Sequence, residues 1–221
     1  VHIIRSYCAN TVLEMIKMEQ WTLIRGEAVF NADGSITVKP PDATPSMRSV
    51  LLFNALPPEP NYDISCKARV EGIVGTEDRP EAQLIIHFTG TVDSRNYYFA
   101  GLGSYGFRGG IGIIVNNVAT KLVDSSAVSD PTDNYVDSLR YTDYDIKVTV
   151  RGTVISVYIN GVFMCAVDDA QLTLGQVGIS TIWSSTTFWN FRVTTPAPCF
   201  IATAAYGSPL APQLNVLRRF R

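Results

Sequence analysis

Residues 141–193 constrain the fold most, because they contain a series of strand patterns separated by turns. Over 146–150, and again over 155–159, apolar residues alternate with polar ones, and this period of two is typical of a strand with one buried face. Asn160-Gly161 follows, and the pair favours a type I′ hairpin turn, because both central residues of that turn need positive φ. The stretch therefore predicts an antiparallel β-meander with one face inward.

The stretch contains four motifs: D-x-x-V-x-V-x-G from Asp145, I-x-V-Y-I-N-G from Ile155, G-x-V-G-I from Gly175 and F-x-N-F-x-V from Phe188. Together they resemble the motifs of the concanavalin A-like lectin/glucanase jelly roll. The resemblance is strongest to laminin-G-like domains and to domains related to glucanases and 3-keto-disaccharide hydrolases, and it covers 21–193. It implies an all-β fold, an antiparallel jelly-roll β-sandwich. This superfold hosts lectins, hydrolases, adhesion modules and structural modules alike, so it leaves the function open.

The sequence divides into three parts. Residues 1–20 are expected to form a short N-terminal arm or helix, 21–193 the β-sandwich, and 194–221 a Pro-rich linker and an apolar tail. The tail letters CFIATAAYGS and LRRFR resemble the CFI-box motif at the C-termini of many exported or surface proteins of bacteria and archaea. The chain starts at Val1 without a basic-then-apolar leader and stops at the arginines of that motif, so we expect processing at either end.

Composition narrows the classes of partner. The 221 residues are 46% hydrophobic and 17% charged, with a formal net charge of −2, which gives no electrostatic reason to expect nucleic acid. No apolar run approaches the ~18 residues of a membrane span. No N-x-Ser/Thr sequon occurs. We therefore expect no membrane span, and the resemblance of the tail to the CFI-box motif implies an exported protein, extracellular or at the cell surface.

The four cysteines are widely spaced, and none forms a C-x-x-C pair. With only two histidines in the chain, this argues against a structural zinc site. In an exported domain of the resembled fold, where the first and last strands are neighbours, Cys8 is expected to pair with Cys199, and Cys66 with Cys165 if geometry allows. The alternative is buried free thiols.

The patterns expected of a hydrolase are missing. The glucanase branch of the resembled fold carries E-x-D-x-x-E on a strand, with carboxylates alternating onto one face. Glu81 is expected in a loop beside Pro80, and Asp143 and Asp145 are expected as solvent-exposed acids at a strand start. No G-x-S-x-G occurs, and His87 has no sequence-level catalytic partner. The prediction is a non-enzyme.

No cofactor is predicted, with calcium as the alternative. Relatives of the resembled fold often hold calcium at loop rims, and Asp124, Asp130, Asp133 and Asp137 supply hard oxygen ligands in one acidic loop. That loop lacks a D-x-D-x-D-G pattern, which favours an ordinary acidic loop.

An aromatic and polar set is the candidate ligand site. The motif D-x-R-N-Y-Y-x-x-x-L from Asp93 resembles the strand that lines the concave sheet of the resembled fold, and an aromatic, Gly-rich loop follows it at 103–110. Sugars are held by aromatic rings and a few polar side chains in concave sites. The candidate glycan-binding residues are His87, Arg95, Asn96, Tyr98, Tyr105 and Arg108. The alternative is that 97–99 packs inside the sandwich.

The function predicted first is an exported, non-catalytic, glycan-binding or adhesive module. The alternative is a self-assembling subunit of a filament, tube or surface layer, joined to other copies through its terminal segments, because both segments are apolar outside a complete sandwich. The candidate assembly residues are Val12, Leu13, Ile16, Phe200, Ile201 and Tyr206. A glycoside hydrolase is third. The expected partners are carbohydrate, other surface proteins or further copies of the chain.

Overall fold

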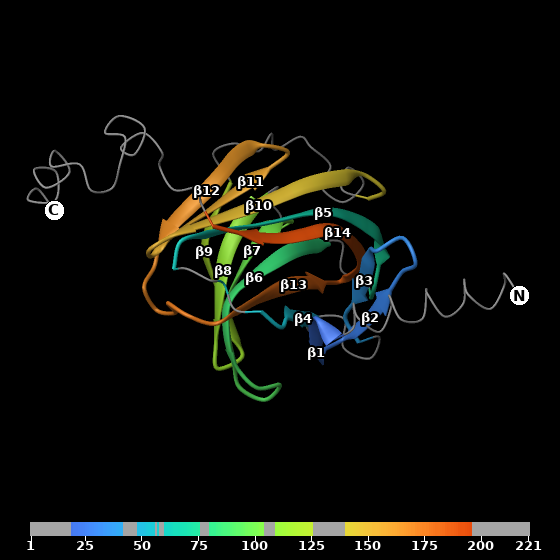
Figure 1. The fold of residues 1–221 in the computed structure, drawn as a ribbon, viewed down its shortest axis with the longest axis horizontal. Helices are drawn as coiled ribbons and strands as arrows, with labels where there is room; N and C mark the ends of the chain where they lie inside the picture. Colours follow the sequence, from blue (N-terminus) through green and yellow to red (C-terminus); the bar gives the residue numbers. More distant parts are fainter. Residues whose placement is uncertain are drawn as a thin grey trace, which may run out of the picture.

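The computed structural model describes residues 19–41, 48–55, 57, 60–75, 80–103, 109–125 and 140–195. These residues form fourteen strands in two seven-stranded antiparallel sheets (Figure 1). Sheet A consists, in spatial order, of β1 (Trp21–Arg25), β4 (Val50–Phe53), β13 (Gln176–Ile182), β6 (Glu81–Gly90), β7 (Arg95–Leu102), β8 (Gly109–Val115) and β9 (Val118–Asp124). Sheet B consists of β12 (Val162–Asp168), β11 (Val154–Ile159), β10 (Asp143–Arg151), β5 (Tyr62–Ile73), β14 (Ser184–Thr194), β3 (Ile36–Lys39) and β2 (Glu27–Phe30). The predicted antiparallel β-sandwich is confirmed.

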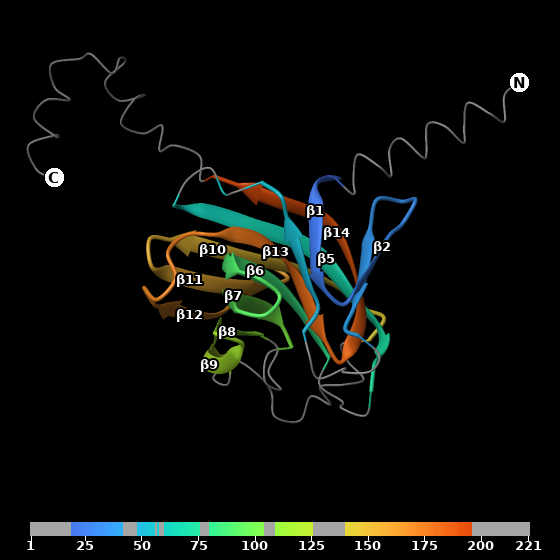
Figure 2. The ribbon, with the colours of Figure 1, turned by 90° about the horizontal axis from the view of Figure 1, so that it is seen from below.

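The chain alternates between the two sheets in blocks. Strands β6 to β9 form a meander in sheet A, and β10 to β12 form one in sheet B. The predicted meander is therefore correct for β10–β12 but wrong beyond them. Strand β13 crosses to sheet A between β4 and β6, and β14 returns to sheet B between β5 and β3 (Figure 2). No helix among the described residues is long and apolar enough to cross a membrane.

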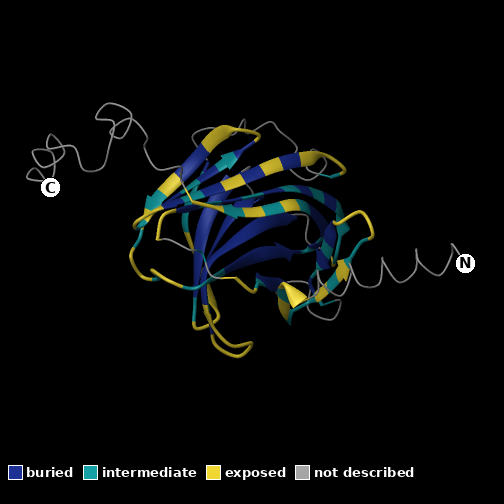
Figure 3. Ribbon diagram, in the orientation of Figure 1, coloured by how far each residue is buried: buried dark blue, intermediate teal, exposed yellow. Residues whose placement is uncertain are grey.

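The half-buried strands of sheet B follow the predicted alternation. Along β10, Ile146, Val148 and Val150 are buried, whereas the residues between them are exposed or intermediate (Figure 3). Strand β5 alternates in the same way, and Cys66 faces the core as predicted. The hairpin between β11 and β12 has φ of 50° at Asn160 and 77° at Gly161, as a type I′ turn requires.

Cys66 and Cys165 are free, buried thiols, which corrects the predicted disulfide between them. Cys66 lies on β5 and Cys165 on β12, and β10 and β11 run between these strands. Three strand spacings separate the two strands by about 14 Å. A disulfide needs Cα atoms within about 7 Å of each other, so the sheet itself keeps the two thiols apart.

The predictions about the two terminal segments concern residues outside the described part of the chain. This holds for Cys8 and Cys199, for the arm residues Val12, Leu13 and Ile16, and for the tail residues Phe200, Ile201 and Tyr206, so the predictions about them stay predictions. The two ends of the sandwich do meet, because the rings of Trp21 on β1 and Phe191 on β14 lie 4.9 Å apart, centroid to centroid.

The inner strands of sheet A, β4, β13, β6, β7 and β8, are buried on both faces, unlike the strands of sheet B. The inner face packs against sheet B, and the outer face carries a second apolar cluster. This cluster consists of Val50, Leu52, Ile85, Phe88, Tyr97, Phe99 and Ile114, with Ile24 packed against it. The first eight residues of β6 are consequently all buried, including the polar Glu81 and Gln83, so its outer face is not marked by solvent exposure. The candidate site is built on this outer face of sheet A.

Candidate functional site

Strand β7 divides its side chains between the two faces of sheet A. Tyr98 belongs to the core between the sheets, whereas Tyr97 and Phe99 belong to the cluster on the outer face. Because side chains alternate along a strand, Arg95 projects to the same side as Tyr97 and Phe99. The outer face of β7 therefore presents a guanidinium, a phenol and a phenyl ring in a row.

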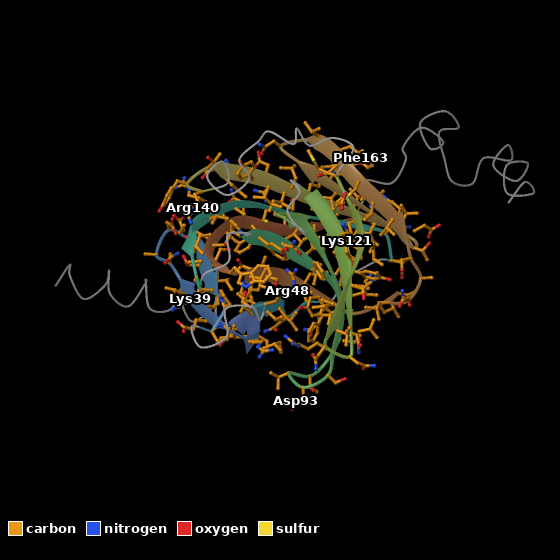
Figure 4. The ribbon with its side chains drawn as sticks, turned by 180° about the vertical axis from the view of Figure 1, so that it is seen from behind. Lys39, Arg48, Asp93, Lys121, Arg140 and Phe163 are labelled. Carbon is orange, nitrogen blue, oxygen red and sulfur yellow. The ribbon has the colours of Figure 1, made fainter. Side chains whose placement is uncertain are left out.

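A stack of two side chains lies at the middle of this face. The ring of Phe99 covers Gly112 on β8 so closely that a Cβ at Gly112 would lie 2.2 Å from the ring's Cζ atom. The guanidinium carbon of Arg48 lies over the same ring, 3.9 Å from the ring centroid, which is cation–π geometry. In Figure 4, Arg48 lies near the middle of the view, and Lys121 marks β9 to one side. The missing side chain of Gly112 gives Phe99 its position, and Phe99 supports Arg48.

Arg48 is also held by two polar side chains of β6. Its Nη2 is 2.6 Å from Glu81 Oε2, and its Nη1 donates to Gln83 Oε1 at 3.4 Å. All three residues are buried, so the ion pair is shielded from water. A buried ion pair is weak evidence for stability, because desolvation offsets the attraction, but it fixes the orientation of the planar guanidinium. Glu81 begins β6, which corrects its predicted position in a loop.

Arg95 and Tyr97 keep unused hydrogen-bonding capacity on the same face. Arg95 Nε donates to Asn117 Oδ1 at 2.8 Å, but its buried Nη1 has no partner in the part of the chain that the structure describes. The buried hydroxyl of Tyr97 likewise has none there. Burial raises the pKa of Tyr97, and the positive charges of Arg48, Arg95 and Arg25 oppose that rise. Three guanidinium groups thus act on one buried hydroxyl.

The other predicted ligand residues do not share this face. The Tyr98 hydroxyl donates to Asp169 Oδ1 at 2.6 Å and accepts from the Leu172 amide at 3.1 Å, inside the sandwich. Burial, followed by the bond to Asp169, raises the pKa of Tyr98 to about 12. Asn96 Oδ1 accepts from the backbone amide of Asn116 at 2.8 Å, near the strand end.

His87 sits at a bulge in β6 with φ of 55°. Its Nδ1 lies 2.8 Å from the Leu172 carbonyl, and its ring lies 6.0 Å from the rings of both Tyr62 and Tyr98. His87 is therefore a core residue. Tyr105 and Arg108 lie outside the described residues. Of the six predicted ligand residues, the structure places Arg95 on the outer face, beside Arg48, Glu81, Gln83, Tyr97 and Phe99, which the sequence analysis did not select.

Comparison with known proteins gives structural neighbours only. No protein-family model matches the chain, and no curated protein matches it. The carbohydrate-binding module CBM66 from Bacillus subtilis superposes with a TM-score of 0.63 at 15% identity, over 80% of this chain and 96% of that one. The exoplasmic/lumenal domain of VIP36 in its Ca²⁺/Man-bound form gives 0.52 at 12% identity, over 81% and 84%. The Bacillus licheniformis β-glucanase gives 0.51 at 8% identity, over 80% and 92%.

These neighbours are consistent with a concanavalin A-like jelly roll. At these identities the likeness establishes the fold alone, and this fold includes both binding modules and hydrolases. The function of the jelly roll described here must be argued from its own side chains.

A second candidate surface lies on the outer face of sheet B. An open groove of about 960 Å³ runs there, lined by Lys67, Asp145, Lys147, Tyr158 and Arg192 among others. Its charges are already partly matched, because Asp63 pairs with Lys147 at 2.8 Å and with Arg151 at 2.6 Å. The outer face of sheet A is the stronger candidate, because its unpartnered groups are buried and an unmet buried polar group is costly.

The described residues contain no group of His, Cys, Asp and Glu side chains that could hold a metal ion. Asp124 ends β9 and pairs with Lys121, its Oδ2 lying 2.7 Å from Nζ. Asp130, Asp133 and Asp137 lie outside the described residues, so calcium binding by this acidic loop stays a prediction.

Proposed function

We propose that this chain is a glycan-binding module that acts without catalysis and binds its ligand on the outer face of sheet A. The observation that carries the proposal is the stack of Arg48 on Phe99, with Arg95 Nη1 and the Tyr97 hydroxyl unpartnered beside it. Glycan sites combine an apolar or aromatic floor with a few fixed polar groups, and this face has both.

The structural neighbours support the proposal at the level of the fold. CBM66 is by its name a carbohydrate-binding module, and the VIP36 domain superposes in a form that holds mannose. A fold does not transfer a function, so the neighbours raise the expectation of glycan binding, and the side chains of the outer face support its choice as the proposed binding surface.

Among the described residues, the carboxylates of this face favour binding over hydrolysis. A glycosidase needs two carboxyl groups, about 5–5.5 Å apart in retaining enzymes and about 6.5–9.5 Å apart in inverting ones. Glu81 is paired with Arg48, and the residues that follow it on the same face of β6 are Gln83 and Ile85. Asp124 on β9 is three strand spacings from β6, about 14 Å. We therefore keep the non-catalytic assignment within the proposal, and with it a location outside the cell or at its surface, where glycans are displayed.

Titration calorimetry against a panel of neutral and acidic oligosaccharides tests the proposal. Arg48→Lys keeps a positive charge for Glu81 but removes the planar fork and the stacking on Phe99. We expect the affinity for the bound glycan to fall about tenfold or more, as for the loss of one charge-assisted hydrogen bond. Arg192→Lys is the matched control on the outer face of sheet B and should bind within about twofold of the parent. Absence of binding to every glycan, or equal loss in both variants, would contradict the proposal.

A further inference from the structure

We infer that the glycan bound on the outer face of sheet A carries an anionic substituent, a carboxylate or a sulfate group, that pairs with Arg95. The inference rests on the proposed function and narrows its ligand class. It starts from Arg95, a residue that is 7% exposed and whose Nη1 has no hydrogen-bond partner among the described residues.

A buried guanidinium without an acidic partner is costly. Arg95 uses Nε on the neutral amide oxygen of Asn117, and no ion pair links it to a carboxylate in the described part of the chain. Burial lowers the pKa of Arg95 and the charge of Arg25 lowers it further, whereas Tyr97 opposes the change. Removing a charge from water is unfavourable unless a counter-charge replaces the lost solvation, so the geometry leaves a position for an anion.

Among the described residues, three positive charges and one negative charge act on the Tyr97 hydroxyl beside Arg95. The positive charges belong to Arg25, Arg48 and Arg95, and the negative charge belongs to Glu81. Glu81 is already matched by Arg48 at 2.6 Å. The Tyr97 hydroxyl is a donor without a partner among the described residues, so it adds a neutral hydrogen bond to the same anion. A neutral sugar would leave Arg95 without a counter-charge among the described residues.

Arg95 lies at an end of the buried layer. It is the first residue of β7 and directly follows the exposed turn residues 91–94. Its Nη1 is covered in this structure, so an anionic substituent reaches it by displacing the atoms that cover it. Guanidinium groups bind carboxylate and sulfate oxygens through paired N–H donors, and this is the chemistry that Nη1 offers.

The test compares three forms of one oligosaccharide: a neutral hexose oligomer, its hexuronate counterpart and a sulfated form of the neutral oligomer. Calorimetry at low and high salt measures the affinity of each for the intact chain. We expect the uronate, the sulfated form or both to bind at least about tenfold more tightly than the neutral form, and the advantage to shrink at high salt. The relative affinities of the uronate and sulfated forms identify which anion is preferred.

Two variants and one control assign the preference to Arg95. Arg95→Met removes the charge and keeps an unbranched side chain, and it should abolish the anion preference while leaving the melting temperature unchanged or higher. Tyr97→Phe deletes only an unpartnered hydroxyl, so it keeps the test valid if Arg95→Met does not fold, and it should reduce the preference severalfold. Lys67→Met removes one charge from the groove on sheet B and should leave the preference intact.

The possible outcomes separate the inference of an anionic substituent from the proposal of glycan binding. Equal affinity for neutral and anionic forms, unaffected by Arg95→Met, overturns the inference and leaves glycan binding in place. An anion preference that persists in Arg95→Met and Tyr97→Phe but disappears in Lys67→Met also overturns it. Absence of binding to all three forms overturns the inference together with the proposed function.

Discussion

Replacing Gly112 with alanine tests how the outer face of sheet A is assembled. The new Cβ would lie 2.2 Å from Phe99 Cζ and 2.6 Å and 2.8 Å from the two neighbouring ring carbons. Ordinary contact begins at 3.4 Å, so the ring must recede by about 1.2 Å. Any such movement disturbs the contact with Arg48, whose guanidinium carbon is 3.9 Å from the ring centroid and which also pairs with Glu81. The substitution therefore displaces the stack rather than one ring.

The expected cost follows from this crowding. Overpacking a buried site costs about 1–3 kcal/mol, because the neighbours cannot move freely. Gly72→Ala is the matched control: Gly72 also lies on a strand, and a Cβ there meets nothing within 4 Å. That variant should be neutral or more stable by about 0.4–1 kcal/mol, through the unfolded state. Urea unfolding of both variants should show a difference of about 2 kcal/mol, and Gly112→Ala should also lose glycan affinity. Equal stability and equal binding in the two variants would refute the assembly described for this face.

Two further predictions concern buried titratable groups. Burial lowers the pKa of His87 below its ordinary value of 6.5, although the bond to the Leu172 carbonyl opposes the shift, so the unfolded chain takes up the proton more readily. The stability that depends on neutral His87 is then fully present above pH 6.5 and is lost as the pH falls below that value. The melting temperature of the parent should therefore drop below pH 6.5, whereas that of His87→Asn should not. A drop of the same size in both proteins would exclude His87 as its cause. Burial raises the pKa of Cys165 to about 11 and raises that of Cys66 as well, so a thiol reagent at neutral pH should label both only after unfolding, and rapid labelling of the native protein would contradict their placement.

The sequence predicts sheet B well, because its strands are half-buried. The alternation over 146–150 and 155–159 corresponds to strands with one solvent-facing side and one buried side. The local sequence Asn160-Gly161 determines the hairpin turn that follows. The inward orientation of Cys66 follows from the same pattern.

The candidate site could not be predicted in the same way, because the inner strands of sheet A are buried on both faces. Alternation disappears along β7, so the pattern cannot separate Tyr97, which lies on the outer face, from Tyr98, which lies in the core. Arg48 follows a Pro-rich connection and reaches Phe99 only through long-range packing. The one available signal was Gly112 opposite an aromatic strand, since a glycine inside a strand often marks a close approach.

The most direct test of glycan binding on the outer face of sheet A is an NMR titration of the labelled chain with the tightest-binding oligosaccharide from the calorimetric panel. We predict that the largest shifts occur at Tyr97, Phe99 and Gly112, and that Lys147 and Tyr158 in the groove on sheet B do not shift. Saturable shifts confined to Lys147, Tyr158 and their neighbours, with Tyr97 and Phe99 unchanged, would place the ligand on sheet B and contradict the account.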